Sequence, residues 1–377
     1  MPLDLTFSDE QNMLRDMVRG VCEQHGSLAR LRELEDDPHG FSPDLWRQLG
    51  ELDLLGVLVP AEYGGLGMTL TDAVVLYEEF GRLLVPSPHF VSAVLAAGIL
   101  SRAGSVDQRE TWLPAIASGS SIVGLAWLEA SGGYREGGIT ATATRCNGKI
   151  VVNGAKRHVA FAADCDAFIV VARADSGEVE LFVVPASNAG ITMTQKMTIG
   201  SDAQYDVTFD NVEIDEAAQL CSGGWATLDT ALTDGAILLA AQAIGGARYT
   251  LDITVEYAKV RQQFDKPLGA FQALAHDMAN ALTAIDGGEV LVHEAAWARD
   301  AGAPFRKLAA MAKLFAGDTF RNVTAMAQQI WGGVGFIVEY DVQLYFRRAK
   351  QLQISWWDSA RLEEIIADEV FAEAASH

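Results

Sequence analysis

Basic residues are scarce in this sequence of 377 residues. It has 28 Lys and Arg against 50 Asp and Glu, and its formal net charge is −22 at pH 7. Such a chain repels nucleic acid and anionic membranes in bulk, so an anionic ligand needs a locally basic segment. Two such segments exist, at Lys259–Lys266 and at Arg347–Lys350. We therefore expect no nucleic-acid partner, whereas an anionic small molecule is compatible with the sequence.

Cysteine is also sparse, and its spacing excludes two kinds of site. The four cysteines are far apart and form no CxxC pair, so neither a zinc site nor a disulfide framework is expected. Reduced cysteines are typical of a cytoplasmic protein. The N-terminus lacks a basic stretch followed by an apolar run, and no segment approaches the ~20 apolar residues of a membrane span. We expect a soluble cytoplasmic protein that has no metal site and does not enter a membrane.

Two nucleotide-binding motifs are missing as well. The sequence contains no strand followed by GxGxxG and a helix, and no GxxxxGK[ST] loop. Both motifs depend on glycines that bring the backbone close to phosphates. A nicotinamide dinucleotide site of the Rossmann type and a P-loop are therefore not expected.

Hydrophobic periodicity divides the chain into three regions. Residues 1–120 are predicted to form an N-terminal helical domain, because apolar residues recur at helical spacing after a capping box of Ser8 and Gln11. Residues 121–222 contain short β-branched runs separated by turn residues, which predict an antiparallel β-barrel or sandwich. Residues 223–377 return to long helical patterns with short loops, which predict a C-terminal bundle of the four-helix type. The predicted fold is mainly α with a central β domain.

Individual elements can be assigned within these regions. The expected strands are Ile139–Thr144, Ile150–Val152, Phe168–Val171, Val179–Val184 and Val207–Val212. The expected long helices of the last region are Trp225–Val260, Phe271–Ala301 and Arg306–Ile330, with a shorter one after Ser359.

Four segments are informative in their order and spacing. They are Leu55–Gly67, Val152–Lys156, Tyr257–Gln272, and Gln329–Phe336 with its continuation to Lys350. Together they resemble the acyl-CoA dehydrogenase family, and the resemblance extends from Phe7 to about Asp368. It implies FAD bound between the β domain and the C-terminal bundle, with a neighbouring subunit completing the site.

The resemblance assigns five residues to the dinucleotide part of FAD. Arg261 and Phe264 would meet the FAD of the adjacent subunit, with Arg261 at the pyrophosphate, for which a forked guanidinium is well suited. Gln272, Gln329 and Gly333 would line the adenosine and pyrophosphate part, where glycine permits close backbone approach.

The end that would hold the flavin ring departs from the family pattern. Trp127–Ala130 stands where typical members have Thr-Glu-Pro-Gly, and His158-Val159-Ala160 stands where they have Trp-Ile-Thr. Trp127 and His158 can stack on a flavin or donate a hydrogen bond to it, but each can equally be a packed residue. Trp127, His158 and Ala160 are therefore the expected contacts of the ring, and they would be unusual ones. Asp265 also replaces the glycine that normally follows the Arg-x-x-Phe motif.

In the family reaction, a base removes the α proton of an acyl-CoA while a hydride leaves Cβ for flavin N5. The base must be a carboxylate within hydrogen-bond reach of that proton. Most members carry it in a loop near the C-terminus, where this chain has Trp356. One branch carries it on the first helix of the C-terminal bundle, where this chain has Gly235 followed by Ala236. Both positions lack a carboxylate.

Two aspartates lie near these positions and are the candidate catalytic residues. Asp234 precedes the helix position by one residue, which rotates it by about 100°, and Asp358 follows the loop position by two. Burial beside tryptophan would raise the pKa of either carboxyl toward a useful range. Alternatively, Asp234 is a solvated or helix N-terminal charge, and Asp358 is the N-cap of the final helix.

Three functions follow as hypotheses. The first is an active dehydrogenase that acts on a bulky or cyclic acyl-CoA, for which Gly235 would make room, and that passes electrons to an electron-transfer flavoprotein. The second is a non-catalytic subunit that completes the FAD site of a base-bearing paralogue. The third is an oxygen-using flavoprotein like an acyl-CoA oxidase, which no residue favours. The assembly is accordingly expected to be a homodimer, a homotetramer or a heterotetramer with a paralogous subunit.

Overall fold

The computed structural model describes residues 7–130 and 132–375, and the chain divides into two compact units. The first, here called the bundle unit, consists of Met1–Ala29, Leu70–Val85 and Ala236–His377. The second, the sheet unit, consists of Arg30–Thr69 and Pro86–Gly235. The three predicted domains, with boundaries at residues 121 and 223, stay a prediction. They were placed where the hydrophobic periodicity changes, whereas the two units are defined by contacts between residues.

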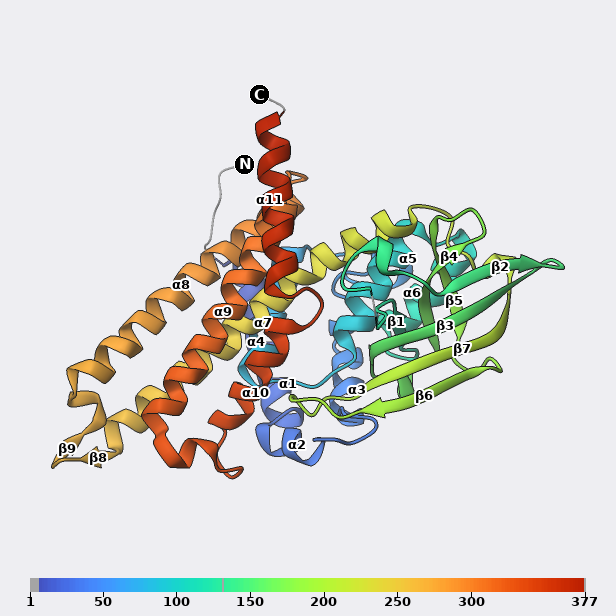
Figure 1. Cartoon of the computed structure of the whole chain (residues 1–377). Helices are drawn as coiled ribbons and strands as arrows, with labels where there is room; N and C mark the ends of the chain where they lie inside the picture. The colour runs from blue at the N-terminus through green and yellow to red at the C-terminus, as the bar shows by residue number, and fades with distance from the viewer. Residues whose placement is uncertain (1–6, 131, 376–377) are drawn as a thin grey trace. The chain divides into compact units, whose positions relative to one another are not determined.

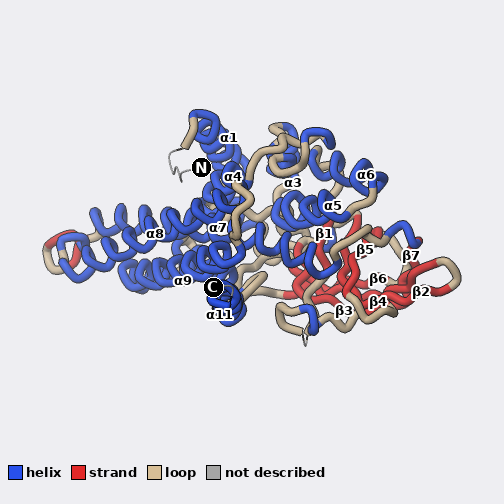
Figure 2. The backbone as a smooth tube through the Cα atoms, turned by 90° about the horizontal axis from the view of Figure 1, so that it is seen from above, coloured by secondary structure: helices blue, strands red, loops and turns tan. Residues whose placement is uncertain are grey.

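The bundle unit is built from long helices, as predicted (Figure 1). Its helices are α1 (Asp9–His25), α4 (Leu70–Arg82), the part of α7 (Gly224–Val260) from Ala236 on, α8 (Gln272–Asp300), α9 (Arg306–Trp331), α10 (Val342–Ile354) and α11 (Ser359–Ala375). A short hairpin of β8 (Gln262–Gln263) and β9 (Lys266–Pro267) joins α7 to α8. Within this unit α9 contacts α8, α10 and α11, and α8 and α9 run side by side (Figure 2). The predicted capping box is confirmed, since Ser8 and Gln11 each accept a hydrogen bond from the other's backbone N–H.

Helix α4 approaches α7 so closely that two glycines are required. A Cβ atom at Gly245 would lie 2.0 Å from the carbonyl oxygen of Glu78, and one at Gly81 would lie 1.9 Å from that of Gln242. No side chain fits at such distances, so the two backbones pack directly on each other. A segment from the N-terminal third of the chain is thereby built into the same unit as the C-terminal helices.

The sheet unit contains one seven-stranded sheet and several short helices. The strands are β1 (Val123–Ala126), β2 (Thr142–Cys146), β3 (Lys149–Ala160), β4 (Ala167–Ala174), β5 (Val179–Pro185), β6 (Ile191–Lys196) and β7 (Gln204–Asp215). The helices are α2 (Leu28–Glu33), α3 (Pro43–Glu51), a π-helix at Phe90–Ala96, α5 (Ala97–Ala103) and α6 (Val106–Ala117).

The sheet order is β1-β4-β2-β3-β7-β6, with β5 also paired to β4. Four of the pairings are antiparallel, as the alternating pattern predicts. The β1–β4 and β2–β4 pairs are parallel, a detail that alternation within a strand does not reveal. The predicted class, a mainly helical protein with a central β domain, is confirmed.

Helix α7 corrects one expectation about membranes. By length and composition alone it is the one helix among the described residues that could cross a membrane, although 83% of its apolar window is buried inside the protein. The core helix of a folded protein passes the same test. The expectation that no segment approaches such a composition is therefore wrong for α7, because its average hydropathy is high although Thr, Gly and Gln interrupt its apolar runs.

Candidate functional site

The hairpin after α7 presents an aromatic ring and a guanidinium to solvent. The turn is made by Phe264 and Asp265, whose φ angles are +53° and +61°. Aspartate tolerates this left-handed conformation better than most residues, which explains how Asp265 can stand where the family usually has glycine. The Phe264 side chain is 86% exposed. Arg261 is also exposed, and within residues 7–130 and 132–375 its guanidinium makes no hydrogen bond or ion pair.

The other predicted dinucleotide contacts lie at the same end of the bundle unit (Figure 1). Gln272 is the first residue of α8, and Gln329 lies in the last turn of α9; both are exposed. The turn that follows α9 has Gly332 at φ +63°, and a Cβ atom at Gly333 would meet nothing within 4 Å. This part of the structure therefore combines a free guanidinium, an exposed ring and an open glycine turn, a set that fits an anionic dinucleotide such as FAD.

Stacked aromatic rings hold the ends of α7 and α9 together. Tyr257 and Trp331 stack with ring centroids 4.1 Å apart and an interplanar angle of 9°, and Trp331 Nε1 donates to Thr254 Oγ1 at 3.2 Å. These contacts fix the direction in which the hairpin and the glycine turn leave the helices.

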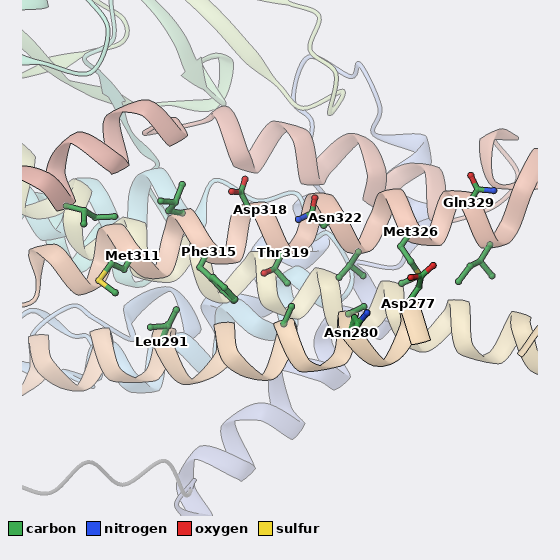
Figure 3. Close-up of a pocket in the computed structure, with 16 residues that line it drawn as sticks. Asp277, Asn280, Leu291, Met311, Phe315, Asp318, Thr319, Asn322, Met326 and Gln329 are labelled. Carbon is green, nitrogen blue, oxygen red and sulfur yellow. The ribbon is translucent and has the colours of Figure 1, made fainter. Parts of the chain in front are cut away.

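A groove of about 840 Å³ runs between α8 and α9, with one lining residue from α11 (Figure 3). Its lining is mostly apolar and includes Leu291, Met311 and Phe315. Gln329 lies at one end of the groove together with Met326 and Asp277. The groove thus begins at the end of the bundle unit that carries the dinucleotide residues.

In the sheet unit, the indole of Trp127 is packed inside. The residue is 4% exposed, and its ring lies 6.0 Å from that of Tyr134 and 6.4 Å from that of Trp225, measured between centroids. Of the two roles that the sequence allows, the structure shows the packed one. A contact of Trp127 with a flavin stays a prediction.

His158 is placed by an irregularity in β3. The pairing of β3 with β7 shifts register between Lys156 and Val159, and His158 itself has φ +53°. A bulge of this kind re-aims a side chain, and it leaves His158 exposed. Its Nδ1 atom is hydrogen-bonded to Oε1 of Gln204 at 2.7 Å, which fixes the ring and leaves Nε2 for another partner. Ala160, two residues on, pairs with the same Gln204 in the sheet.

A buried ion pair lies directly behind these two segments. Lys156 is fully buried, and its Nζ atom donates to Glu129 Oε1 at 2.6 Å and to the carbonyl oxygens of Val171 and Trp127 at 2.5 and 3.3 Å. Burial alone would raise the pKa of Glu129, but hydrogen bonds from Lys156 and Thr140 outweigh it and lower that pKa. Glu129 is therefore an ionised carboxylate inside the protein.

Asp234, the first candidate base, is engaged by an arginine. It lies in the interior of α7, is 6% exposed and forms an ion pair with Arg102. The alternative that it is solvated or helix N-terminal is therefore wrong. Its role as the base stays a prediction.

The absence of a side chain at Gly235 leaves room for the phenyl ring of Phe90. A Cβ atom there would lie 2.9 Å from Cζ of Phe90 and 3.0 Å from a methyl carbon of Leu95. The expectation that this glycine opens room for a wide acyl chain therefore loses its basis, because Phe90 occupies the space.

Asp358, the second candidate base, caps α11. Its Oδ1 atom accepts a hydrogen bond from the backbone N–H of Arg361 at 2.9 Å, which is the structural role that the sequence also allows. Trp356, two residues earlier, has a left-handed backbone with φ +67°. The loop between them is held from inside the bundle unit by Lys313, which donates to the carbonyl oxygen of Trp357 at 2.9 Å.

The structure adds four residues that the sequence prediction missed: Glu129, Lys156, Arg102 and Lys313. A signal existed for two of them. Lys313 follows Ala309 and Ala312 on an apolar face, and Lys156 continues the alternation of the buried residues Ile150 and Val152. A charge within a buried pattern indicates a buried partner.

Comparison with known proteins agrees with the fold and with these motifs, which together indicate a flavin-dependent oxidoreductase. The N-terminal, middle and C-terminal domains of acyl-CoA dehydrogenases match residues 8–120, 124–212 and 222–371. The chain is 30% identical to benzylmalonyl-CoA dehydrogenase of Aromatoleum aromaticum, over 98% of this chain and all of that one. It is 32% identical to acyl-CoA dehydrogenase IpdE2 of Mycolicibacterium smegmatis, over 91% and 93% of the two chains.

A solved structure is similar over its whole length. A chain of the ChsE4-ChsE5 complex from Mycobacterium tuberculosis superimposes with a TM-score of 0.89 and 27% identity, covering 97% of this chain and 98% of that one. This chain belongs to the acyl-CoA dehydrogenase family, a family of flavoprotein oxidoreductases.

Proposed function

We propose that this chain is an FAD-dependent oxidoreductase that removes hydrogen from the α and β carbons of an acyl-CoA thioester. The observation that carries the proposal is the end of the bundle unit, where Arg261, Phe264 and the Gly332–Gly333 turn are exposed together. Arg261 would hold the pyrophosphate of the FAD of the adjacent subunit, and Phe264 would cover part of that cofactor. Gln272 and Gln329 would line the adenosine and pyrophosphate part of FAD.

Within the sheet unit, His158 is the residue that we assign to the flavin ring. Bound FAD would supply the acceptor for the hydride that leaves Cβ. His158 offers a hydrogen-bond acceptor at Nε2, because its Nδ1–H donates to the Gln204 amide oxygen that holds the ring in place. We propose that electrons then pass to an electron-transfer flavoprotein.

The direct test is flavin binding by the full-length chain. We expect the purified protein to contain FAD, and Arg261→Ala to weaken FAD binding by about tenfold or more, since a charge-assisted contact to phosphate is lost. Lys259→Ala is the matched control, because Lys259 is an exposed cation two residues earlier that already pairs with Glu256. Equal effects of the two substitutions would show that Arg261 only adds to the general charge.

A second candidate function is a subunit that works with a base-bearing paralogue. It is favoured by the state of both candidate bases, since Asp234 is ion-paired and Asp358 caps a helix. The similar ChsE4-ChsE5 structure is a complex of two differently named chains. In such an assembly this chain would contribute its dinucleotide-binding end to the site.

Anaerobic bleaching of the flavin by a panel of acyl-CoA thioesters separates the two candidates. Bleaching by the chain alone that is abolished by Asp234→Asn or Asp358→Asn supports the first. Bleaching that requires co-expression with the product of a neighbouring paralogous gene supports the second. Rapid turnover with oxygen and release of hydrogen peroxide would contradict both and indicate an oxidase.

A further inference from the structure

We propose that the buried Lys156–Glu129 pair positions the two segments of the sheet unit that face the flavin ring. The proposal rests on the proposed function, because it assigns these segments to FAD. Lys156 and Glu129 would be positioning residues, since neither is exposed to a ligand: Lys156 is fully buried and Glu129 is 8% exposed.

The pair connects three parts of the chain at one point. From β3, the Lys156 amine reaches Glu129 and the Trp127 carbonyl in the loop after β1, and also the Val171 carbonyl in β4. The Glu129 carboxylate in turn accepts hydrogen bonds from the backbone N–H groups of Thr140 and Ala141, at 2.9 and 3.1 Å, and from the Thr140 hydroxyl.

The same two segments are joined a second time, next to the ion pair. The backbone N–H of Arg157 donates to the carbonyl oxygen of Leu128 at 2.8 Å. Arg157 lies between Lys156 and His158 in the register shift of β3. The ion pair therefore fixes the loop at Trp127–Glu129 and the bulge that aims His158 as one unit.

Stability alone does not account for a fully buried ion pair. An apolar pair of the same volume is often as stable or more stable, because the two charges must be removed from water. What the pair adds is a defined geometry of the segments that it joins. Every donor of a buried ammonium and both carboxylate oxygens must meet particular partners, so the segments can adopt only one relative position. An apolar pair would leave the Trp127 carbonyl without a donor and the loop free to shift.

Four variants of the full-length chain test this role. Lys156→Met and Glu129→Gln each remove one charge, and the double variant Lys156→Met/Glu129→Leu removes both without leaving a buried charge alone. The double variant decides the question if either single variant fails to fold. Lys196→Met is the matched control, because Lys196 lies in the same sheet and forms an exposed ion pair with Asp206 at 3.1 Å.

The first measurement is hydrogen exchange on flavin-free protein. We expect peptides that cover residues 127–129 and 156–158 to exchange about tenfold faster or more in the double variant, because the tether no longer restrains local opening. The Lys196→Met control should exchange like the parent. Unchanged exchange in a folded double variant would overturn the proposal.

The second measurement is the absorption spectrum and affinity of bound FAD. We expect a shifted flavin band and a fall in kcat of about tenfold or more with little change in KM for the acyl-CoA, as displacement of a site by a fraction of an ångström would produce. Faster exchange with an unaltered flavin spectrum and kcat would also overturn the positioning role and leave a purely structural one. If the parent chain binds no FAD at all, the proposed function is refuted, and with it any flavin role of the pair. The exchange measurement would still show whether the Lys156–Glu129 pair restrains the two segments.

Discussion

The side-chain amine of Lys313 lies 2.9 Å from the carbonyl oxygen of Trp357 and 3.3 Å from that of Leu352. Lys313 is 4% exposed, so a single buried amine fixes the chain on both sides of Trp356. Trp356 has a left-handed backbone, which costs free energy in a bulky residue and has to be stabilised by its surroundings. The loop in which most family members carry their base is therefore held rigidly even though it lacks a carboxylate at that position.

Burial lowers the pKa of Lys313 to about 7, from an ordinary value of 10.5. The folded protein therefore releases this proton near neutral pH, while the unfolded chain keeps it until about pH 10. Stability relative to Lys313→Met should rise with pH between 7 and 10, by up to about 1.4 kcal/mol per pH unit. Urea unfolding of both proteins at several pH values measures this difference. The same difference at every pH would contradict the burial of an unprotonated amine, and Lys307→Met at the exposed pair with Glu373 is the control.

The Arg102–Asp234 ion pair should contribute much more to the free energy of unfolding than an exposed ion pair does. Arg102→Met would leave the buried Asp234 carboxylate without its cation, at a cost of about 2–3 kcal/mol in the free energy of unfolding. Adding Asp234→Asn should recover part of the loss, since a neutral amide tolerates burial better. Arg47→Met at the exposed Arg47–Glu51 pair should cost less than about 1 kcal/mol. Equal losses for the two arginines would mean that Asp234 is solvated after all.

The contact between Gly235 and Phe90 predicts a size-dependent effect. Gly235→Ala should destabilise the protein by about 1–3 kcal/mol, because the new methyl group overlaps the Phe90 ring. Phe90→Leu combined with Gly235→Ala should restore part of the stability. Gly20 in α1 is the control: a Cβ there meets nothing within 4 Å, so Gly20→Ala should be neutral or stabilising by up to about 1 kcal/mol. Thermal unfolding of these three variants and of Phe90→Leu alone tests the packing, and additive effects in the double variant would refute direct contact.

His89 should contribute to the loss of stability in acid. It is 3% exposed, with Nε2 3.1 Å from the carbonyl oxygen of Leu54, and burial lowers its pKa to about 4. Between pH 6.5 and 4 the unfolded chain binds a proton that the folded protein does not. The free energy of unfolding therefore decreases as the pH is lowered, by up to about 1.4 kcal/mol per pH unit from this group. Urea unfolding should show a flatter acid dependence for His89→Gln than for the parent. The same replacement at the exposed His276 is the control, and an unchanged slope for His89→Gln would contradict the prediction.

Features that are determined by residues close together in the sequence could be predicted from it. The capping box of Ser8 and Gln11 involves neighbouring residues, and the predicted helix Trp225–Val260 agrees with the observed Gly224–Val260. Strand β1 was missed because its four residues are all buried and show no alternation.

The surroundings of the candidate site depend on distant contacts. Arg102 and Asp234 are 132 positions apart, and Lys156 and Glu129 are 27 apart. Neither pairing has a signature in the local sequence, because each results from tertiary packing. The motif residues Arg261, Phe264 and Gly333 were found by resemblance, and the structure adds that they are exposed and gathered at one end of the helices.

The direct packing of α4 on α7 also constrains the order in which the protein can form during its synthesis. Helices α1 and α4 leave the ribosome early, but the carbonyl of Gln242 that Gly81 approaches is made about 160 residues later, after the whole sheet. The sheet unit can therefore fold cotranslationally, whereas α1 and α4 must wait with their apolar faces uncovered. Nascent chains stalled before α7 should consequently be the forms most dependent on chaperones and most prone to aggregate.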